Sequence, residues 1–83
     1  MMSSNEIVEN LRAIWAETLK APVTDTTDFF WEGGHSFMAL DIIARAEETL
    51  HIQVPLRLLF DYPRFDSFIG ALEDLILSKG LIS

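Results

Sequence analysis

The chain contains no cysteine, only three prolines, and six lysines and arginines against thirteen aspartates and glutamates. Without cysteine, neither disulfide bonds nor thiolate metal sites can stabilise a small fold, so side-chain packing has to supply the stability. The formal charge of −7 argues against nucleic acid as a partner, because phosphate backbones bind basic surfaces. This charge instead favours partners that offer basic or apolar surfaces.

Long hydrophobic runs are also absent. No stretch of the sequence is apolar enough to span a membrane, and the N-terminus lacks the basic start and apolar run of a secretory signal. Together with the lack of cysteine, these absences predict a soluble protein of the cytoplasm that does not contact membranes. Met1 favours a free-standing protein, although a domain excised from a larger chain would look the same.

The apolar material that is present suffices for one compact domain. Hydrophobic residues make up 49% of the sequence and aromatic residues 11%, far more than a disordered chain contains. Because 83 residues cannot close a second hydrophobic core, we expect a single domain over residues 1–83.

The first half of the sequence predicts two helices with a long loop between them. Apolar residues recur at helical spacing after a Ser3-x-x-Glu6 capping box, which predicts a first helix near residues 4–20. Residues 21–35 contain proline, paired glycines and Thr-Asp pairs, all of which favour turns over helix. A second helix is expected from Ser36 to about Leu50, where the periodic pattern ends.

The second half predicts one short helix and one long helix. A helical turn is expected from Pro55 to Asp61, because proline suits the first helical position. The last helix should start with Asp66 or Ser67 as its cap and end near Lys79-Gly80. Because strand signals are poor throughout, the sequence predicts an all-α fold, a small helical bundle of three main helices plus one short helix.

Three consecutive aromatic residues, Phe29, Phe30 and Trp31, lie in the middle of the predicted loop. Long loops in small domains usually need an anchor or have a function. We therefore expect at least two of these three rings to enter the core.

Ser36 follows two glycines and stands at the start of the second predicted helix. Gly33 and Gly34 allow a close approach that a Cβ would resist, which leaves the Ser36 hydroxyl exposed. A helix N-terminus offers free N–H groups and a positive dipole end, so a phosphodiester on Ser36 would lie where negative charge is favoured. The alternative is that Ser36 only caps the helix, since serine is a preferred N-cap.

The second predicted helix has two apolar surfaces. At about 100° per residue, one set of side chains clusters on a single core-facing side. This set comprises Ala39, Ile42, Ile43, Ala46 and Leu50. Phe37, Leu40 and Ala44 lie on a different strip that begins beside Ser36, and an exposed apolar strip there suits transient docking of a partner. Alternatively, Phe37 and Leu40 pack under the loop or against the short helix.

Catalytic and metal-binding interpretations find little support. His35 adjoins Ser36, but consecutive side chains do not normally meet as a base and its nucleophile, and a G-x-S-x-G turn is absent. His35 and His51 are the only histidines, and no HExxH or comparable ligand spacing occurs. We therefore expect neither an enzyme nor a metal site.

The stretch Asp28-Phe29-Phe30-x-x-Gly33-Gly34-His35-Ser36 closely resembles the thiolation motif of peptidyl carrier proteins from nonribosomal peptide synthetases. The resemblance covers nearly the whole chain and extends to Ile52-x-Val54-Pro55 and Leu59-Phe60-Asp61-x-Pro63. It implies an acyl-carrier-like bundle whose serine receives 4′-phosphopantetheine from coenzyme A through a phosphopantetheinyl transferase. The arm then holds aminoacyl or peptidyl thioesters.

The resemblance also implies roles for individual residues. Ser36 is the attachment site, and Gly33, Gly34 and His35 shape the attachment loop. Three apolar residues are expected to dock partners; these are Phe37, Leu40 and, by resemblance, Phe60. Partners would be adenylation, condensation or tailoring enzymes of secondary metabolism, such as antibiotic biosynthesis, which supply the catalysis for a monomeric carrier.

Two alternatives remain open from the sequence. Fatty-acid and polyketide acyl carriers resemble this family in fold, but they usually carry Asp where His35 stands and have a more acidic second helix. Phe37 and Arg64 depart from the Leu and Thr that are usual at these positions of the peptidyl class. The second alternative is an unmodified helical protein-interaction domain, in which the motif is an ordinary loop and helix start.

Overall fold

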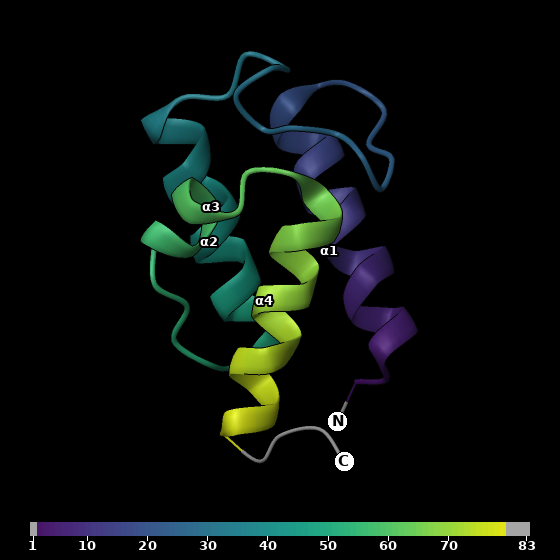
Figure 1. Ribbon diagram of the computed structural model, residues 1–83, viewed down its shortest axis with the longest axis vertical. Helices are drawn as coiled ribbons and strands as arrows, with labels where there is room; N and C mark the ends of the chain where they lie inside the picture. The colour runs from purple at the N-terminus through teal and green to yellow at the C-terminus, as the bar shows by residue number, and fades with distance from the viewer. Residues whose placement is uncertain (1, 80–83) are drawn as a thin grey trace.

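The computed structural model describes residues 2–79, which form three long helices and one short helix. These elements are α1 (Ser4–Leu19), α2 (Ser36–Leu50), α3 (Arg57–Asp61) and α4 (Phe65–Ser78). The predicted all-α bundle is thus confirmed. α1 runs in one direction while α2 and α4 run in the opposite direction (Figure 1). No helix within residues 2–79 has the length and apolar character needed to cross a membrane.

α1 begins and ends as its sequence dictates. The Ser3 hydroxyl accepts from the Glu6 N–H at 3.2 Å, and the Glu6 carboxylate accepts from the Ser3 N–H at 3.2 Å, which forms the predicted capping box. At the other end Lys20 takes a left-handed conformation and closes the helix with a bond to the Ala16 carbonyl. The buried residues recur every four positions; they are Ile7, Leu11, Trp15 and Leu19.

α2 packs against α1 through the surface that was predicted to face the core. Four of its side chains are buried, namely Ala39, Ile42, Ile43 and Ala46, and Leu50 is partly buried. The helix ends at His51, which is left-handed like Lys20 and whose N–H donates to the Glu47 carbonyl at 2.8 Å. Exposed Ala44 lies on the opposite strip, as expected.

An aromatic cluster forms the centre of the core. Trp15 of α1 is fully buried, and three phenylalanine rings pack around it with centroids at 5.1–6.0 Å. Phe65 and Phe68 come from α4, whereas Phe29 comes from the loop that precedes α2. Such ring pairs add about 0.5–1.5 kcal/mol beyond the burial of their area. The loop is therefore built into the core by at least one of its aromatic residues.

The beginning of α4 corrects the sequence prediction. The helix starts at Phe65 with Arg64 at the N-cap position, rather than at Asp66 or Ser67, and no side chain caps it. The Phe65 N–H instead donates to the Thr27 carbonyl at 2.7 Å, and the Asp66 N–H donates to the Asp25 carbonyl at 2.9 Å. The distant loop thus supplies acceptors that a capping side chain would otherwise provide.

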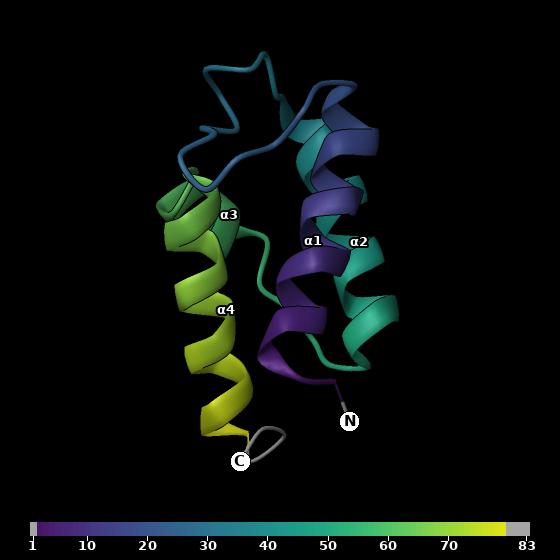
Figure 2. The same ribbon diagram turned by 90° about the vertical axis from the view of Figure 1, so that its right-hand side faces the viewer.

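Of two further helix ends, one differs slightly from the prediction and one agrees with it. α3 begins at Arg57 rather than at Pro55, and the Pro55 carbonyl accepts from the Leu58 N–H at 3.0 Å in the turn that leads into the helix. α4 ends at Ser78 with Lys79 as its C-cap, and Gly80 lies outside the described residues. α3 packs beside the first turns of α4 (Figure 2).

Candidate functional site

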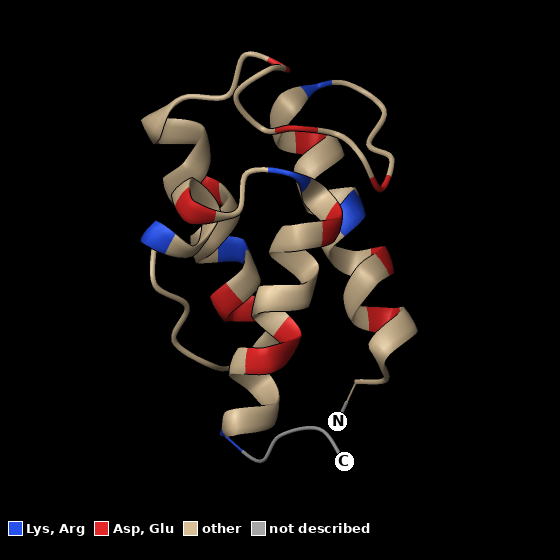
Figure 3. Cartoon of the chain, viewed as in Figure 1, with Lys and Arg blue, Asp and Glu red and all other residues tan. Residues whose placement is uncertain are grey.

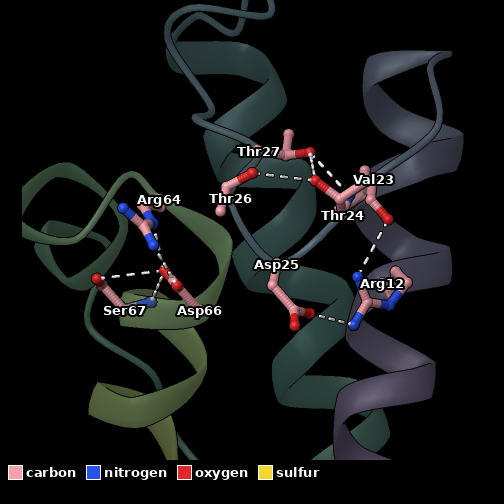
Figure 4. A network of polar contacts seen from close by, with 9 residues as sticks. All are labelled: Arg12, Val23, Thr24, Asp25, Thr26, Thr27, Arg64, Asp66 and Ser67. Carbon is pink, nitrogen blue, oxygen red and sulfur yellow. Dashed lines mark hydrogen bonds and ion pairs between the residues drawn. The ribbon is translucent and has the colours of Figure 1, made fainter.

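The loop between α1 and α2 lies across the end of the bundle where α1 finishes and α2 begins (Figures 1 and 2). Arg12 of α1 holds its first part, because the guanidinium donates to the Val23 carbonyl at 3.1 Å and to the Asp25 carboxylate at 2.7 Å (Figure 4). The same guanidinium lies 4.8 Å from the centroid of the Phe65 ring. One arginine therefore connects α1, the loop and α4.

Backbone bonds fix the loop to the junction of α3 and α4. The Phe29 N–H donates to the Pro63 carbonyl at 2.7 Å, and Asp28 and Arg64 form an isolated antiparallel bridge. Next to this bridge, Arg64 forms two bonds of 2.8 Å with the Asp66 carboxylate (Figure 4). This hydrogen-bonded ion pair lowers the pKa of Asp66 and raises the pKa of Arg64.

The three consecutive aromatic residues of the loop have different environments, which corrects the expectation that at least two enter the core. Phe29 is fully buried, Phe30 is 45% exposed and Trp31 is 89% exposed. The Phe30 ring stacks on Phe60 of α3 at 5.8 Å with an angle of 13° between the planes. The chain turns immediately after Phe29, so that only this ring can reach Trp15.

Four hydrogen bonds close this turn over residues 28–34. The Trp31 N–H donates to the Asp28 carboxylate at 3.0 Å, and the Glu32 N–H donates to the Asp28 carbonyl at 3.1 Å. The Gly33 N–H donates to the Phe30 carbonyl at 3.0 Å, and the Gly34 N–H donates to the Phe29 carbonyl at 2.9 Å. The aspartate at the first position is typical of such turns.

The two glycines serve different geometric needs. Gly33 has a φ of +88°, a conformation that residues with a Cβ rarely adopt. A Cβ on Gly34 would lie 2.5 Å from the Phe29 ring and 2.6 Å from the Phe29 carbonyl oxygen. Gly34 therefore allows the chain to pass directly over the buried phenylalanine, as the predicted close approach requires.

Ser36 lies directly after this turn, as the first residue of α2, and is exposed. His35, not Ser36, occupies the N-cap position, and its side chain makes no capping bond. Ser36 therefore does not act as the helix cap, which argues against the alternative that this serine serves only as an N-cap. The first intrahelical bond runs from the Ala39 N–H to the His35 carbonyl at 2.9 Å. The N–H groups of residues 36–38 therefore have no acceptor within the helix, and they lie at the end of α2 that carries the Ser36 hydroxyl.

This geometry can hold a negative charge on the serine. Free N–H groups and the positive dipole end of α2 favour an anion at this point, and no Asp or Glu lies in the first turn. The residues fit a phosphodiester attached to Ser36, because the side chain is exposed and Gly34 leaves no Cβ in the preceding turn. Within residues 2–79, no group of three or more His, Asp or Glu side chains could bind a metal ion.

The predicted docking residues lie on the surface. Phe37 is 80% exposed and Leu40 is 50% exposed, so neither packs under the loop. The Phe37 ring meets the His35 ring edge to face at 6.4 Å. Phe60 is 38% exposed and is partly covered by Phe30. Trp31 is more exposed than any of these, and the sequence prediction did not single it out because it expected at least two of the three aromatic rings to enter the core.

Most charged side chains of α2 form ion pairs or hydrogen bonds within the molecule. Arg45 pairs with Glu17 of α1 at 2.9 Å and with Asp41 at 3.3 Å, and the Glu47 carboxylate accepts from the Val54 N–H at 2.9 Å. Acidic residues are nevertheless distributed over all three long helices and the loop, whereas basic residues are few (Figure 3). The second helix is therefore only mildly acidic, as predicted.

Comparison with known proteins finds a matching family model and similar sequences. A family model described as "Phosphopantetheine attachment site" matches residues 9–72. Tyrocidine synthase 3 of Brevibacillus parabrevis is 41% identical over 63 residues, which cover 75% of this chain. Gramicidin S synthase 2 of Brevibacillus brevis is 39% identical over 64 residues, which cover 76% of this chain. The matched segment spans only 1% of each synthase.

Solved structures agree with this match. BlmI, a type-II acyl-carrier-protein from Streptomyces verticillus involved in bleomycin biosynthesis, superposes with a TM-score of 0.82 at 27% identity. This superposition covers 88% of the present chain and 89% of BlmI. A nonribosomal PCP domain superposes with a TM-score of 0.69 at 25% identity over 84% of this chain and 88% of its own. The family predicted from the motif is thus confirmed.

Proposed function

The chain belongs to the phosphopantetheine attachment-site family, and we propose that it is a peptidyl carrier protein whose Ser36 bears a 4′-phosphopantetheine arm. One observation carries this proposal. Ser36 is exposed at the positive end of α2, directly after a turn in which Gly34 passes over Phe29 without room for a Cβ. The exposed hydroxyl is accessible for a phosphate-linked group, and no Asp or Glu in the first turn of α2 opposes the charge of that group.

The attachment step breaks the phosphoanhydride bond of coenzyme A and forms a phosphate ester on Ser36. The Ser36 oxygen bonds to the phosphorus next to the pantetheine of coenzyme A, the bond to the nucleotide's other phosphate breaks, and adenosine 3′,5′-bisphosphate leaves. The hydroxyl proton passes to a base of the phosphopantetheinyl transferase, where Mg²⁺ assists. The chain itself supplies the nucleophile, its exposure and its electrostatic surroundings. The bound arm supplies a thiol for thioester formation.

The cargo and partners follow from the family and from two features of this chain. His35 stands where fatty-acid and polyketide carriers usually have Asp, and α2 is only mildly acidic. These features favour aminoacyl or peptidyl thioesters over the acyl chains of polyketide or fatty-acid synthesis. We propose that adenylation, condensation or tailoring enzymes act on the cargo, and that residues 1–83 form one non-catalytic carrier domain that is monomeric and cytoplasmic.

Intact-protein mass spectrometry tests the attachment. The protein is incubated with coenzyme A, Mg²⁺ and a broad-specificity phosphopantetheinyl transferase, alongside Ser36→Ala and Ser67→Ala. Ser67 is a matched control, because it is exposed in the first turn of α4 as Ser36 is in the first turn of α2. We expect one phosphopantetheinyl group on the wild type and on Ser67→Ala, and none on Ser36→Ala.

The alternative, an unmodified interaction domain, predicts a different result. Wild-type protein with the helical circular dichroism of a folded bundle would then gain no mass with any of several transferases. Ser36→Ala should retain the wild-type stability, because Ser36 does not cap α2 and makes no capping bond whose loss would destabilise the helix.

A further inference from the structure

Trp31 presents the most exposed large apolar side chain of the described residues, at 89% exposure. Its backbone is nevertheless held in place, since its N–H donates to the Asp28 carboxylate at 3.0 Å and the following Glu32 N–H donates to the Asp28 carbonyl. A large apolar ring that extends into water from a fixed turn loses little backbone freedom when a partner binds it. Tryptophans in such positions dominate the binding energy of many interfaces.

The position of Trp31 limits which partner can cover it. Ser36 follows Trp31 by five positions, so their Cα atoms lie at most about 18 Å apart even in a fully extended chain. The turn bonds of Gly33 and Gly34 shorten this path. A standard interface buries about 800 Å² on each partner, which corresponds to a disc of about 16 Å radius. An enzyme whose active site is centred on the Ser36 hydroxyl therefore has Trp31 within or near the range of a standard interface.

Only one class of partner must reach the serine oxygen itself. Enzymes that act on the thioester do their chemistry at the far end of the arm. The enzyme that transfers the phosphopantetheinyl group must bring its catalytic groups to the Ser36 oxygen. The turn also carries the carboxylates of Asp28 and Glu32 on either side of Trp31 in the sequence. A complementary partner surface would have an apolar socket with Lys or Arg at its rim.

We propose that Trp31 is a docking residue for the phosphopantetheinyl transferase, separate from the strip formed by Phe37 and Leu40 on α2. This inference rests on the proposed attachment at Ser36. It assigns to the exposed ring of the loop a role in recognising the enzyme that modifies the chain, and the buried ring of Phe29 holds the loop in place for that contact.

Kinetics of arm transfer test the proposal. We compare kcat and KM of a transferase for the wild type, Trp31→Ala, Trp31→Phe and Leu77→Ala. Leu77 is the matched control, because it is 51% exposed in the last turn of α4, at the opposite end of the bundle from the start of α2 (Figure 1). Trp31→Ala should raise KM about tenfold or more with little change in kcat. Trp31→Phe should recover most of the loss, and Leu77→Ala should match the wild type.

Two results overturn the inference and are distinguishable. If the wild type receives no arm, the proposed attachment at Ser36 fails and the docking role fails with it. If the wild type is modified but Trp31→Ala has the same kcat/KM within about twofold, attachment stands and the docking role of Trp31 is wrong.

A binding measurement separates docking from any effect on turnover. The protein has two tryptophans, Trp15 with 0% exposure and Trp31 with 89%, so 5-fluorotryptophan labelling gives one buried and one exposed ¹⁹F resonance. Labelled Ser36→Ala protein is titrated with transferase and coenzyme A, and Trp31→Phe assigns the signals. We expect the Trp31 resonance to change its chemical shift while that of Trp15 does not. An unchanged Trp31 resonance at saturation would refute the contact.

Discussion

The loop between α1 and α2 consists of two halves that differ in almost every respect. Its inner half, residues 21–29, buries Val23, Thr27 and Phe29 and is bonded to both α1 and the start of α4. Its outer half, residues 30–35, is mostly exposed, and its backbone bonds are to the loop itself, apart from the His35 carbonyl, which accepts from the Ala39 N–H of α2. The comparison teaches that an exposed turn can be held in a defined conformation when the segment before it is part of the core.

This division separates stability from function along one short segment. Changes to the buried side chains of the inner half should destabilise the protein most, whereas changes to the exposed side chains of the outer half should cost little stability and alter mainly what binds there. Three measurements can break or sharpen this comparison.

The largest difference should appear between two neighbouring phenylalanines. Phe29→Ala removes a fully buried ring that packs on Trp15, and should lower the free energy of unfolding by about 3–5 kcal/mol. Phe30→Ala removes a half-exposed ring stacked on Phe60, and should lower it by about 1 kcal/mol. Urea denaturation of both variants measures the difference. Equal losses would show that the two halves are not distinct.

A pair of glycines gives the next largest contrast. Gly34→Ala would place a methyl group 2.6 Å from the Phe29 carbonyl oxygen, so backbone must shift, and we expect a loss of about 1–3 kcal/mol. Gly70→Ala is the control, because a Cβ there has open space within a helix and should stabilise α4 by up to about 1 kcal/mol. Thermal unfolding should therefore shift in opposite directions. A stabilised Gly34→Ala would contradict the close approach over Phe29.

The smallest effect concerns the acid stability that the ion pair of Arg64 and Asp66 contributes, beside the backbone bonds that join the inner half of the loop to α4. The bonds from Arg64 lower the pKa of Asp66 in the folded protein below the ordinary aspartate pKa of about 3.9. Its stabilising contribution is therefore complete above that pH and is lost as the pH falls through the lower folded-state pKa. Asp66→Asn should reduce the acid dependence of urea midpoints below about pH 4. An unchanged pH profile would show that this exposed pair contributes nothing.

The helices were predictable because their signals are local. The capping box at Ser3 and Glu6 and the four-residue spacing of apolar residues set α1, and the core-facing set of α2 was identified from periodicity alone. The position of Ser36 at the start of α2 was equally local, since the two glycines and His35 precede it.

The features that could not be predicted depend on contacts between distant segments. α4 begins at Phe65 because the carbonyls of Thr27 and Asp25 replace a side-chain cap, and nothing near Phe65 in the sequence shows this. Which of the three consecutive aromatic residues is buried depends on the turn over residues 28–34, which directs Phe29 into the core and leaves Trp31 exposed. Asp28, with the two glycines that follow, was the available signal for that turn.

The bonds that join the loop to the start of α4 have one common property with consequences for sequence divergence. They connect backbone atoms: the Asp25 and Thr27 carbonyls, the Phe29 N–H, the Pro63 carbonyl, and the N–H groups of Phe65 and Asp66. A side chain can change by mutation without removing such a bond, provided that the new residue is not proline at a donor position. Exposed positions of this junction can therefore drift over evolutionary time, and descendants can acquire new partner preferences while they inherit the same loop path.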